Sequence, residues 1–374
     1  LPGSPVAYWL SSEIRELFLR ADLSKVGTAR QGLATADNRR FVRSWYEVDL
    51  SNIGFGCHDE AQSWKSGLTW FPYNKGGERR KWYGNHDCVV NWKNGGHLIR
   101  QSNRARVQNT DFYFRESVSW GLITSNSSSF RYFPAGFIYD VGGMSYFPTE
   151  KVFQVLSMLN TSLVGKLAKV LNPTVNLQVG DVASLPYLIT PSIEASTERI
   201  GKDCTDIARS DWDAYETSWD FTTLPLLKFD HRGAKIAETY TALRTHWQSM
   251  TDEMQQLEEE NNRIFIDAYG LQEELTPELP LNEITLTCNP AYRYGVKGSE
   301  ADRETRLRAD TMAEFLSYAV GCMFGRYSLD APGLILANQG ERLEDYLTRI
   351  PEPQFMPDED NVIPVLDADW FLDD

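Results

Sequence analysis

Cysteine is scarce in this chain, and long hydrophobic runs are absent from it. The five cysteines among the 374 residues are scattered, odd in number and without a CxxC pair. They therefore predict neither a disulfide framework nor an oxidising compartment. No signal peptide is recognisable, and no apolar run reaches the roughly 18 residues that a membrane-spanning helix needs. We therefore expect a cytoplasmic protein with no membrane partner.

The common catalytic motifs are missing as well. The sequence contains no Walker A, GxSxG or HExxH motif and no visible set of nuclease carboxylates. Asn289-Pro290-Ala291-Tyr292 approaches the motif with which amino-methyltransferases hold a flipped adenine, but alanine replaces the second proline. No glycine-rich strand–loop–helix for S-adenosylmethionine lies upstream. We expect a turn here, after a strand over 283–288, and no catalytic residue in this chain.

Histidines and cysteines also fail to form a metal-site pattern. His58 lies beside Cys57 and His86 lies near Cys88, while His97 stands apart. These spacings differ from those of zinc fingers, ribbons and knuckles. The sequence therefore predicts no metal site.

Charge is distributed very unevenly along the chain. Residues 1–190 carry 21 Lys/Arg and 15 Asp/Glu, a net of +6, whereas residues 191–374 carry 16 and 37, a net of −21. Such asymmetry is typical of a chain that meets nucleic acid on one side. A soluble two-domain protein with an acidic, solvated tail would show the same averages.

Positive charge is densest between Lys65 and Arg115, where ten Lys/Arg stand against three Asp/Glu. Cations attract phosphates, aromatic rings stack or wedge, and asparagine reads base edges. The stretch therefore indicates a nucleic-acid surface. The aromatic residues interleaved with its cations are Trp64, Trp70, Phe71, Tyr73, Trp82, Tyr83 and Trp92. Of these, we expect Trp70, Trp82 and Trp92 to pack in the core.

Three parts of the N-terminal half supply candidate contacts. The loop 74–81 (NKGGERRK) is suited to entering a groove or clamping phosphates, and Arg104 and Arg106 can lie on one face of a strand. Arginines of an earlier turn extend the surface. The predicted DNA-binding residues are Arg30, Arg39, Arg40, Lys65, Asn74, Lys75, Arg79, Arg80, Lys81, Asn85, Lys93, Arg104 and Arg106.

Hydrophobic periodicity predicts an α+β fold, with a β-rich first half and a mostly helical second half. In the first half we expect a helix over 4–20 capped by Ser4, a strand in 41–50, irregular β structure over 50–145, a helix over 149–171 capped by Thr149, and a strand in 171–189.

The second half is expected to contain two long helices. Apolar positions step by four and three from Ile236 to Ile264, which predicts a long helix with a coiled-coil-like seam. A further helix over 301–324 should pack through Leu307, Phe315 and Leu316. The acidic, proline-rich stretch 351–374 is typical of a linker.

Seven segments, in chain order, also carry a family resemblance: 29–48, 70–92, 107–125, 171–189, 210–221, 319–334 and 362–371. They resemble the PglX family, the adenine-specific DNA methyltransferases of bacteriophage exclusion (BREX) systems. The NPT-N-QVGD-LP element within 172–186 also resembles the end of target recognition domains in the wider type IIG restriction-modification group.

The resemblance implies a longer parent protein whose catalytic domain precedes this chain and uses S-adenosylmethionine. The missing initiator Met agrees with that expectation. Residues 1–190 would be the DNA target recognition domain, and 191–374 a helical spacer and C-terminal domain with an acidic tail. Methylation of adenine N6 would mark host DNA as self. The implied partners are double-stranded DNA, other BREX components and acidic DNA-mimic inhibitors from phage.

Two other functions compete with this interpretation. The acidic half could be a protein-interaction module of a phage-defence complex, with the basic half docked on it within the chain. Alternatively, the chain could be the nuclease segment of a type IIG restriction enzyme.

Overall fold

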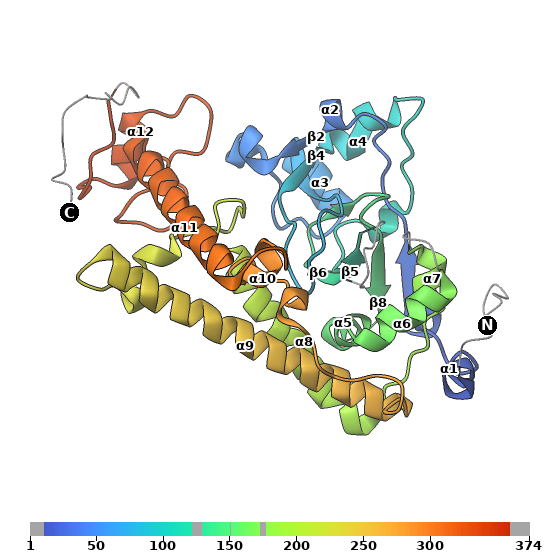
Figure 1. The fold of residues 1–374 in the computed structure, drawn as a ribbon. Helices are drawn as coiled ribbons and strands as arrows, with labels where there is room; N and C mark the ends of the chain where they lie inside the picture. Colours follow the sequence, from blue (N-terminus) through green and yellow to red (C-terminus); the bar gives the residue numbers. More distant parts are fainter. Residues whose placement is uncertain (1–10, 122–128, 150, 173–176, 360–374) are drawn as a thin grey trace.

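The computed structural model describes residues 11–121, 129–149, 151–172 and 177–359. Within these ranges the predicted α+β class is confirmed: two four-stranded sheets lie in the first half and long helices dominate the second (Figure 1). The strands are β1 (Gly27–Arg30), β2 (Val42–Ser44), β3 (Trp70–Asn74), β4 (Cys88–Asn91), β5 (Ser117–Trp120), β6 (Phe130–Phe133), β7 (Ile138–Tyr139) and β8 (Ser145–Pro148). The helices are α1 (Ser12–Leu17), α2 (Asn38–Phe41), α3 (Glu60–Ser66), α4 (Lys93–Arg100), α5 (Val152–Leu159), α6 (Ser162–Leu171), α7 (Val179–Ala183), α8 (Pro191–Trp212), α9 (Ile236–Tyr269), α10 (Pro290–Arg293), α11 (Glu300–Met323) and α12 (Leu343–Arg349).

The first sheet has the strand order β1-β8-β5-β6, and all its neighbours pair antiparallel. Helix α5 packs on β5 and β6, and α8 packs on α5. Gly201 of α8 allows this close approach, because a Cβ there would lie 2.2 Å from the carbonyl oxygen of Phe153. The long helix α9 lies along α8, so sheet, α5, α8 and α9 follow one another as layers (Figure 1).

The second sheet has the order β2-β4-β3-β7, with β3 and β7 parallel and the other pairs antiparallel. Alternating apolar residues of these strands form a core with Trp92 and Phe114, both fully buried. The prediction that Trp82 and Trp92 pack in the interior is confirmed, and Trp70 is half-buried. Helices α2, α3 and α4 lie around this sheet and carry four of the eleven candidate cations: Arg39, Arg40, Lys65 and Lys93.

The two long helices that the sequence predicted, α9 and α11, are present, whereas the 22-residue helix α8 was not predicted. Helix α9 buries Leu243, Trp247 and Met254 along its seam and ends at Gly270, whose φ of 72° is the left-handed conformation that glycine adopts easily. Helix α11 begins with a reciprocal cap between Ser299 and Asp302. Its predicted packing through Leu316 was wrong, because that side chain is 64% exposed.

Two predicted helices differ in extent. The helix expected over 149–171 is interrupted at residues 160–161, because the Thr161 side chain accepts the N–H of Val164 and starts α6. Lys151, rather than Thr149, precedes α5. Helix α1 is capped by Ser11, and the predicted cap Ser4 lies outside the described residues.

Three predicted strands were wrong in whole or in part, because side chains bind the backbone groups that a sheet would use. After β2, a capping box between Ser44 and Glu47 turns residues 45–47 into a 3₁₀ helix. Within the described part of 171–189, residues 179–183 form α7, again with a capping box. In 283–288, the Asp211 carboxylate accepts the N–H groups of Thr287 and Cys288, so no strand forms there.

One hydrophobic cluster joins the two halves. It contains buried residues of β5 and α5 together with Leu243 and Met254 of α9 and Leu307 of α11. The predicted boundary near residue 190 falls just before α8, and this cluster crosses it. None of the described helices has both the length and the apolar character needed to cross a membrane.

Candidate nucleic-acid interface

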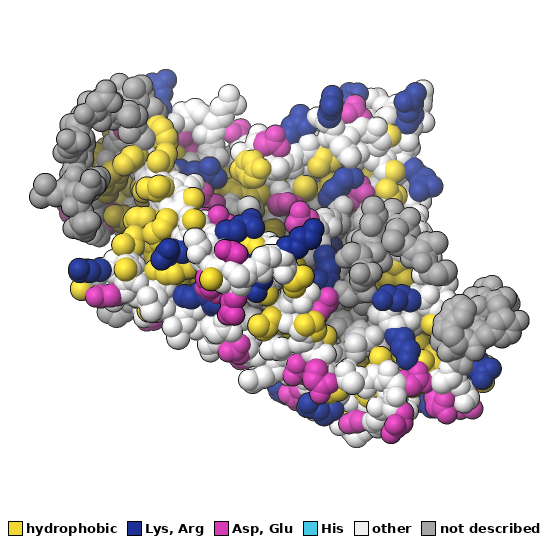
Figure 2. Space-filling model, viewed as in Figure 1, with side chains coloured by type: hydrophobic (Ala, Val, Ile, Leu, Met, Phe, Trp, Pro, Cys, Tyr) yellow, Lys and Arg dark blue, Asp and Glu magenta, His cyan; other side chains and the backbone are white. Residues whose placement is uncertain are grey.

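Six of the predicted DNA-binding cations are exposed, and we call them the exposed basic face: Arg39, Arg40, Lys65, Lys93, Arg104 and Arg106. Within the described ranges none of the six forms an ion pair. Figure 2 shows Lys and Arg side chains gathered along the upper edge of the molecule, over α2 and α4. Their charge is therefore available to a ligand.

A short backbone pairing holds the two arginine segments together. The backbones of Ala34 and Arg106 exchange two N–H···O bonds of 2.9 Å, and the side chain of Gln108 donates to the Gly32 carbonyl. Asp37 caps α2 by accepting the N–H of Arg40 at 3.1 Å. The arginines of α2 and of 104–106 therefore project from adjoining segments.

Helices α3 and α4 carry the two lysines of the face. They pack against each other, and Arg100 of α4 forms an ion pair of 3.4 Å with Glu60 of α3. Gly67 ends α3 with a φ of 68°. Helix α4 ends at Arg100, and the turn 102–105 that follows it contains Arg104. The lysine-bearing helices are therefore connected along the chain to the segment that carries Arg104 and Arg106.

The loop 75–81 has a different environment. Its three consecutive cations each pair with a carboxylate of the C-terminal half: Arg79 with Glu283, Arg80 with Asp211 on α8, and Lys81 with Glu258 on α9. The side chains of Lys81 and Glu258 are only 4% and 2% exposed. The basic loop is thus docked within the chain on the acidic half, an arrangement that the interaction-module alternative anticipated.

The Arg80 contact shows how closely this docking is fitted. The guanidinium lies 3.1 Å from Asp211 and 5.1 Å from the ring centroid of Trp212. Gly84 adopts a φ of 121°, and a Cβ there would lie 2.5 Å from the Arg80 Cδ. The neighbouring Lys81 donates its backbone N–H to Thr285 at 2.9 Å. Side chain and backbone of this loop are therefore both fixed by the helical half.

Arg131 of β6 binds the backbone of the same loop from within the core. It is fully buried, and its guanidinium donates to the carbonyl oxygens of Gly76, Glu78 and Arg80 at 3.0–3.3 Å. Burial lowers the pKa of Arg131 to about 10, with a smaller contribution from the nearby Arg80. Arg131 was not among the predicted contacts, because its partners are backbone carbonyls, which no sequence pattern marks.

The remaining predicted contacts are internal or half-buried. Asn74 is buried and donates to Ser119 at 2.6 Å, while Lys75 pairs with Asp140 at 2.6 Å. Asn85 donates to carbonyls of the 76–78 turn. Arg30 is half-buried, with its guanidinium 5.3 Å from the Phe112 ring centroid. A DNA contact by Asn74, Arg80 or Lys81 would require this packing to open, because all three side chains are buried.

A buried histidine lies in an aromatic cluster next to the docked loop. The His86 ring lies 4.4–4.8 Å, centroid to centroid, from Tyr83, Phe133 and Phe137. Burial, followed by the proximity of Arg131, lowers the pKa of His86 to about 3. The imidazole is therefore neutral at physiological pH and acts as a packing residue.

The sequence of this chain is similar to the sequences of known enzymes. No protein-family model matches the chain. The adenine-specific methyltransferase PglX of Lacticaseibacillus casei (strain Zhang) is 37% identical over 397 residues, and the adenine-specific methyltransferase BrxX of Escherichia coli O9:H4 (strain HS) is 33% identical over 381 residues. Both alignments cover 100% of this chain. The chain is homologous to the PglX and BrxX adenine-specific methyltransferases. It spans about 30% of the length of each relative.

The described residues do not fit the S-adenosylmethionine that such an enzyme implies. Methyltransferases bind it at the end of a strand in a parallel sheet, through a glycine-rich loop that opens a helix. Among the described strands only β3 and β7 pair in parallel, over two residue pairs, and the other parallel contacts are isolated bridges. Neither strand leads through such a loop into a helix. We therefore place no methyl-transfer step on these residues.

Asn289 has a local structural role. Its side chain caps α10 by accepting the Ala291 N–H, and it donates to the carbonyls of Leu281 and Ile284 at 2.7 and 2.8 Å. Both N–H groups and the oxygen of the Asn289 side-chain amide are thus hydrogen-bonded to nearby backbone groups. Across the described residues, no three His, Cys, Asp or Glu side chains gather as a metal site.

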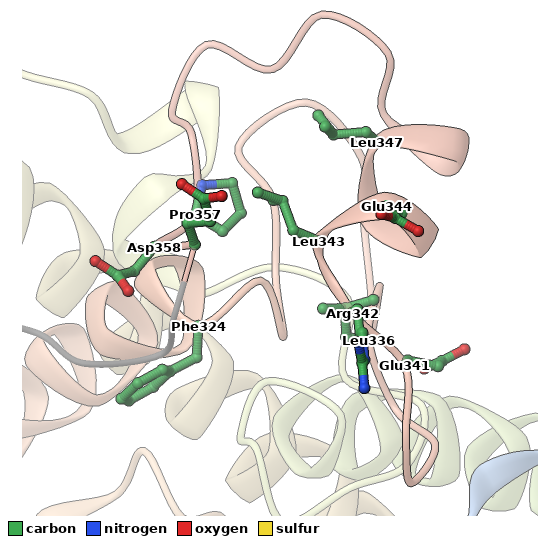
Figure 3. Close-up of a pocket in the computed structure, with 10 residues that line it drawn as sticks. Phe324, Leu336, Glu341, Arg342, Leu343, Glu344, Leu347, Pro357 and Asp358 are labelled. Atoms are coloured by element: carbon green, nitrogen blue, oxygen red, sulfur yellow. The ribbon is translucent and has the colours of Figure 1, made fainter.

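A cavity of about 540 Å³ lies in the C-terminal half, between the end of α11 and α12. Leu343 and Leu347 project from α12 toward the segment of Pro357 (Figure 3). Burial would raise the pKa of Glu341 on its rim, but hydrogen bonds from Arg349 and Asn338 lower that pKa to about 2. No residue of the exposed basic face lines this cavity, so it does not belong to the candidate interface.

Proposed function

We propose that this chain binds duplex DNA and recognises a short sequence for an adenine-N6 DNA methyltransferase of the BREX type. The observation that carries the proposal is the exposed basic face, because six exposed cations without carboxylate partners form a surface for a polyanion. Because the whole chain is homologous to adenine-specific methyltransferases, we infer that this polyanion is DNA.

In the longer protein, this segment would hold the duplex while another part transfers the methyl group from S-adenosylmethionine. An adenine inside a duplex is reached by flipping it out of the stack. Contacts of the basic face with phosphates would fix the register of the duplex, and contacts with base edges would select the sequence. The methylated host genome would then be distinguished from unmodified phage DNA.

The proposal is tested by measuring DNA affinity as a function of salt concentration. If the six cations contact about six phosphates, the logarithm of the association constant should fall with the logarithm of salt with a slope of about −5. Changing Arg104 and Arg106 together to Ala should make the slope less steep by about 2.

Lys202, an exposed residue of α8 in the acidic half, provides the matched control. Lys202→Ala should leave the slope unchanged. Wild-type binding without salt dependence, or equal effects of the Arg104/Arg106 and Lys202 variants, would contradict the proposal.

A second candidate function is docking of another BREX protein, and an apolar surface favours it. Leu316 and Val320 of α11 and Phe324, which directly follows the helix, are spaced four residues apart and are 64%, 43% and 38% exposed. Phe355 and Met356, also exposed, precede Asp358, whose N–H donates to the Met323 carbonyl at 2.8 Å. Figure 2 shows the corresponding hydrophobic surface over α11. Exposed apolar patches of this kind often mark protein contacts.

Co-purification tests this second function in cells that carry a complete BREX locus. Leu316→Glu combined with Val320→Glu, introduced into the full-length parent, should remove a co-purifying BREX protein and leave the salt slope of DNA binding unchanged. Unaltered co-purification would exclude the α11 surface as the docking site.

A further inference from the structure

Trp64 stands apart from the other tryptophans of the protein. Its side chain is 58% exposed, and the other described tryptophans are all buried or half-buried. Trp45, Trp82, Trp92 and Trp120 are at most 3% exposed. A large aromatic side chain left in water forgoes the stabilisation that its burial would give. Its position therefore suggests a ligand that covers it.

The local structure holds the indole on a rigid base. Trp64 lies in the last turn of α3, and its six-membered ring faces the backbone of Gly95 in α4. A Cβ at Gly95 would lie 3.0 Å from the Trp64 Cζ3, and the φ of 65° there also favours glycine. Within the described residues, no other aromatic ring and no cation stacks on the indole. One edge of the ring is thus supported, and the rest faces solvent.

Three cations lie close to Trp64 in the sequence or on the adjoining helix α4. Lys65 follows it in sequence, Lys93 precedes Gly95 by two residues, and the Arg100 Nε donates to the Gly95 carbonyl at 2.8 Å. The nearby Glu60 is engaged by Arg100. A flat apolar group flanked by free positive charge suits a partner that offers both stacked rings and phosphates.

We propose that Trp64 inserts between adjacent base pairs of the bound duplex and unstacks that step. The inference rests on the DNA-binding function proposed above. The lysines beside Trp64 bind the phosphates that flank the opened step, while the indole replaces part of the lost stacking. Local opening of the duplex lowers the cost of extruding a nearby base, which links this residue to adenine methylation.

Fluorescent base analogues test the insertion. A duplex is first selected from a random-sequence pool by binding to the wild-type chain, and 2-aminopurine then replaces each adenine in turn. Wild-type protein should raise the fluorescence at one or two neighbouring positions. Trp64→Ala should abolish that rise and weaken binding about tenfold, with the salt slope unchanged. Trp64→Phe, which keeps a flat ring, should retain most of both effects.

Leu98→Ala is the matched control, because Leu98 is an exposed apolar residue of the adjoining helix α4. It should leave fluorescence and affinity unchanged. Photocross-linking of a 5-bromouracil duplex to Trp64 in the wild-type chain provides a readout that needs no variant. A Trp64→Ala protein with wild-type affinity and fluorescence would overturn the insertion, even if the Arg104/Arg106 variant flattens the salt slope. If the wild-type chain binds no DNA at all, the proposed function and this inference both fail.

Discussion

The cations of loop 75–81 and four of the six cations of the exposed basic face come from the same stretch of sequence, 65–115, but have opposite surroundings. Arg79, Arg80 and Lys81 are paired with acids of the helical half, whereas Lys65, Lys93 and Arg104 have no described acidic partner. The first group joins the two halves of the molecule, and we infer that the second group meets DNA. A dense run of positive charge therefore contains both structural and ligand-binding residues.

Whether a cation of this stretch is structural or free to bind a ligand depends on whether a carboxylate of the helical half lies next to it. Asp211, Glu258 and Glu283 lie 131, 177 and 204 residues beyond the cations that they bind. Breaking a buried ion pair leaves an uncompensated charge in the interior, whereas removing an exposed cation leaves only water behind. The two groups should thus respond very differently to mutation.

The largest effect is expected at the buried pair. Lys81→Met would leave the Glu258 carboxylate buried with only the Trp82 indole N–H as a donor, at 2.8 Å. We expect the free energy of unfolding to fall by about 3–5 kcal/mol. Urea-induced unfolding measures it, with Lys65→Met as the exposed control, which should change stability by no more than about 0.5 kcal/mol. A loss below about 1 kcal/mol for Lys81→Met would show that the docked loop does not hold the halves together.

An intermediate effect should follow from the buried His86. Its pKa of about 3 in the folded chain lies below the value of about 6.5 for an unfolded histidine. Below about pH 6.5 the unfolded chain therefore binds a proton that the folded chain does not. Stability should fall as the pH is lowered, by about 2 kcal/mol from this residue between pH 7 and pH 5.

The variant His86→Phe keeps an aromatic ring among Tyr83, Phe133 and Phe137 but cannot titrate. Unfolding by urea at pH 7, 6 and 5 should show a smaller loss of stability in this variant than in the wild type. Parallel pH dependences would mean that His86 is protonated without cost in the folded chain.

The smallest effect on stability is expected at the exposed lysines. Lys65→Ala and Lys93→Ala should each alter the free energy of unfolding by no more than about 0.5 kcal/mol, because neither side chain is paired. Together they should still make the salt slope of DNA binding less steep by about 2. If Lys65→Ala or Lys93→Ala lowered the free energy of unfolding as much as Lys81→Met, the exposed lysines would be as important for stability as the paired loop cations, which would contradict the comparison.

Much of the helical architecture could be predicted from the sequence, because long periodic segments carry a strong signal. Helices α9 and α11 agree with their predicted ranges to within a few residues. Shorter elements were less predictable, since single side chains decide them. Thr161 divides one predicted helix, and Asp211, which is 76 residues away from Thr287, removes a predicted strand.

The candidate site was predicted only in part, because the sequence shows where charge lies but not which charges are paired in the folded chain. The sequence identified where positive charge is concentrated, and it correctly assigned Trp82 and Trp92 to the interior. It gave no indication of which cations would be neutralised, because that depends on how the two halves pack. Trp64 was one aromatic residue among seven in the sequence, and only its exposure in the folded chain distinguishes it.

Chemical acetylation of lysines, with and without duplex DNA, tests whether the exposed lysines contact DNA while the cations of loop 75–81 stay paired within the chain. Exposed amines react, whereas paired and buried amines do not. Mass spectrometry should find Lys65, Lys93 and Lys202 modified in the free chain and Lys81 unmodified. Addition of duplex DNA should protect Lys65 and Lys93 while Lys202 stays reactive. Protection of Lys202 alone, or a Lys81 that reacts in the free chain and is protected by DNA, would contradict the account.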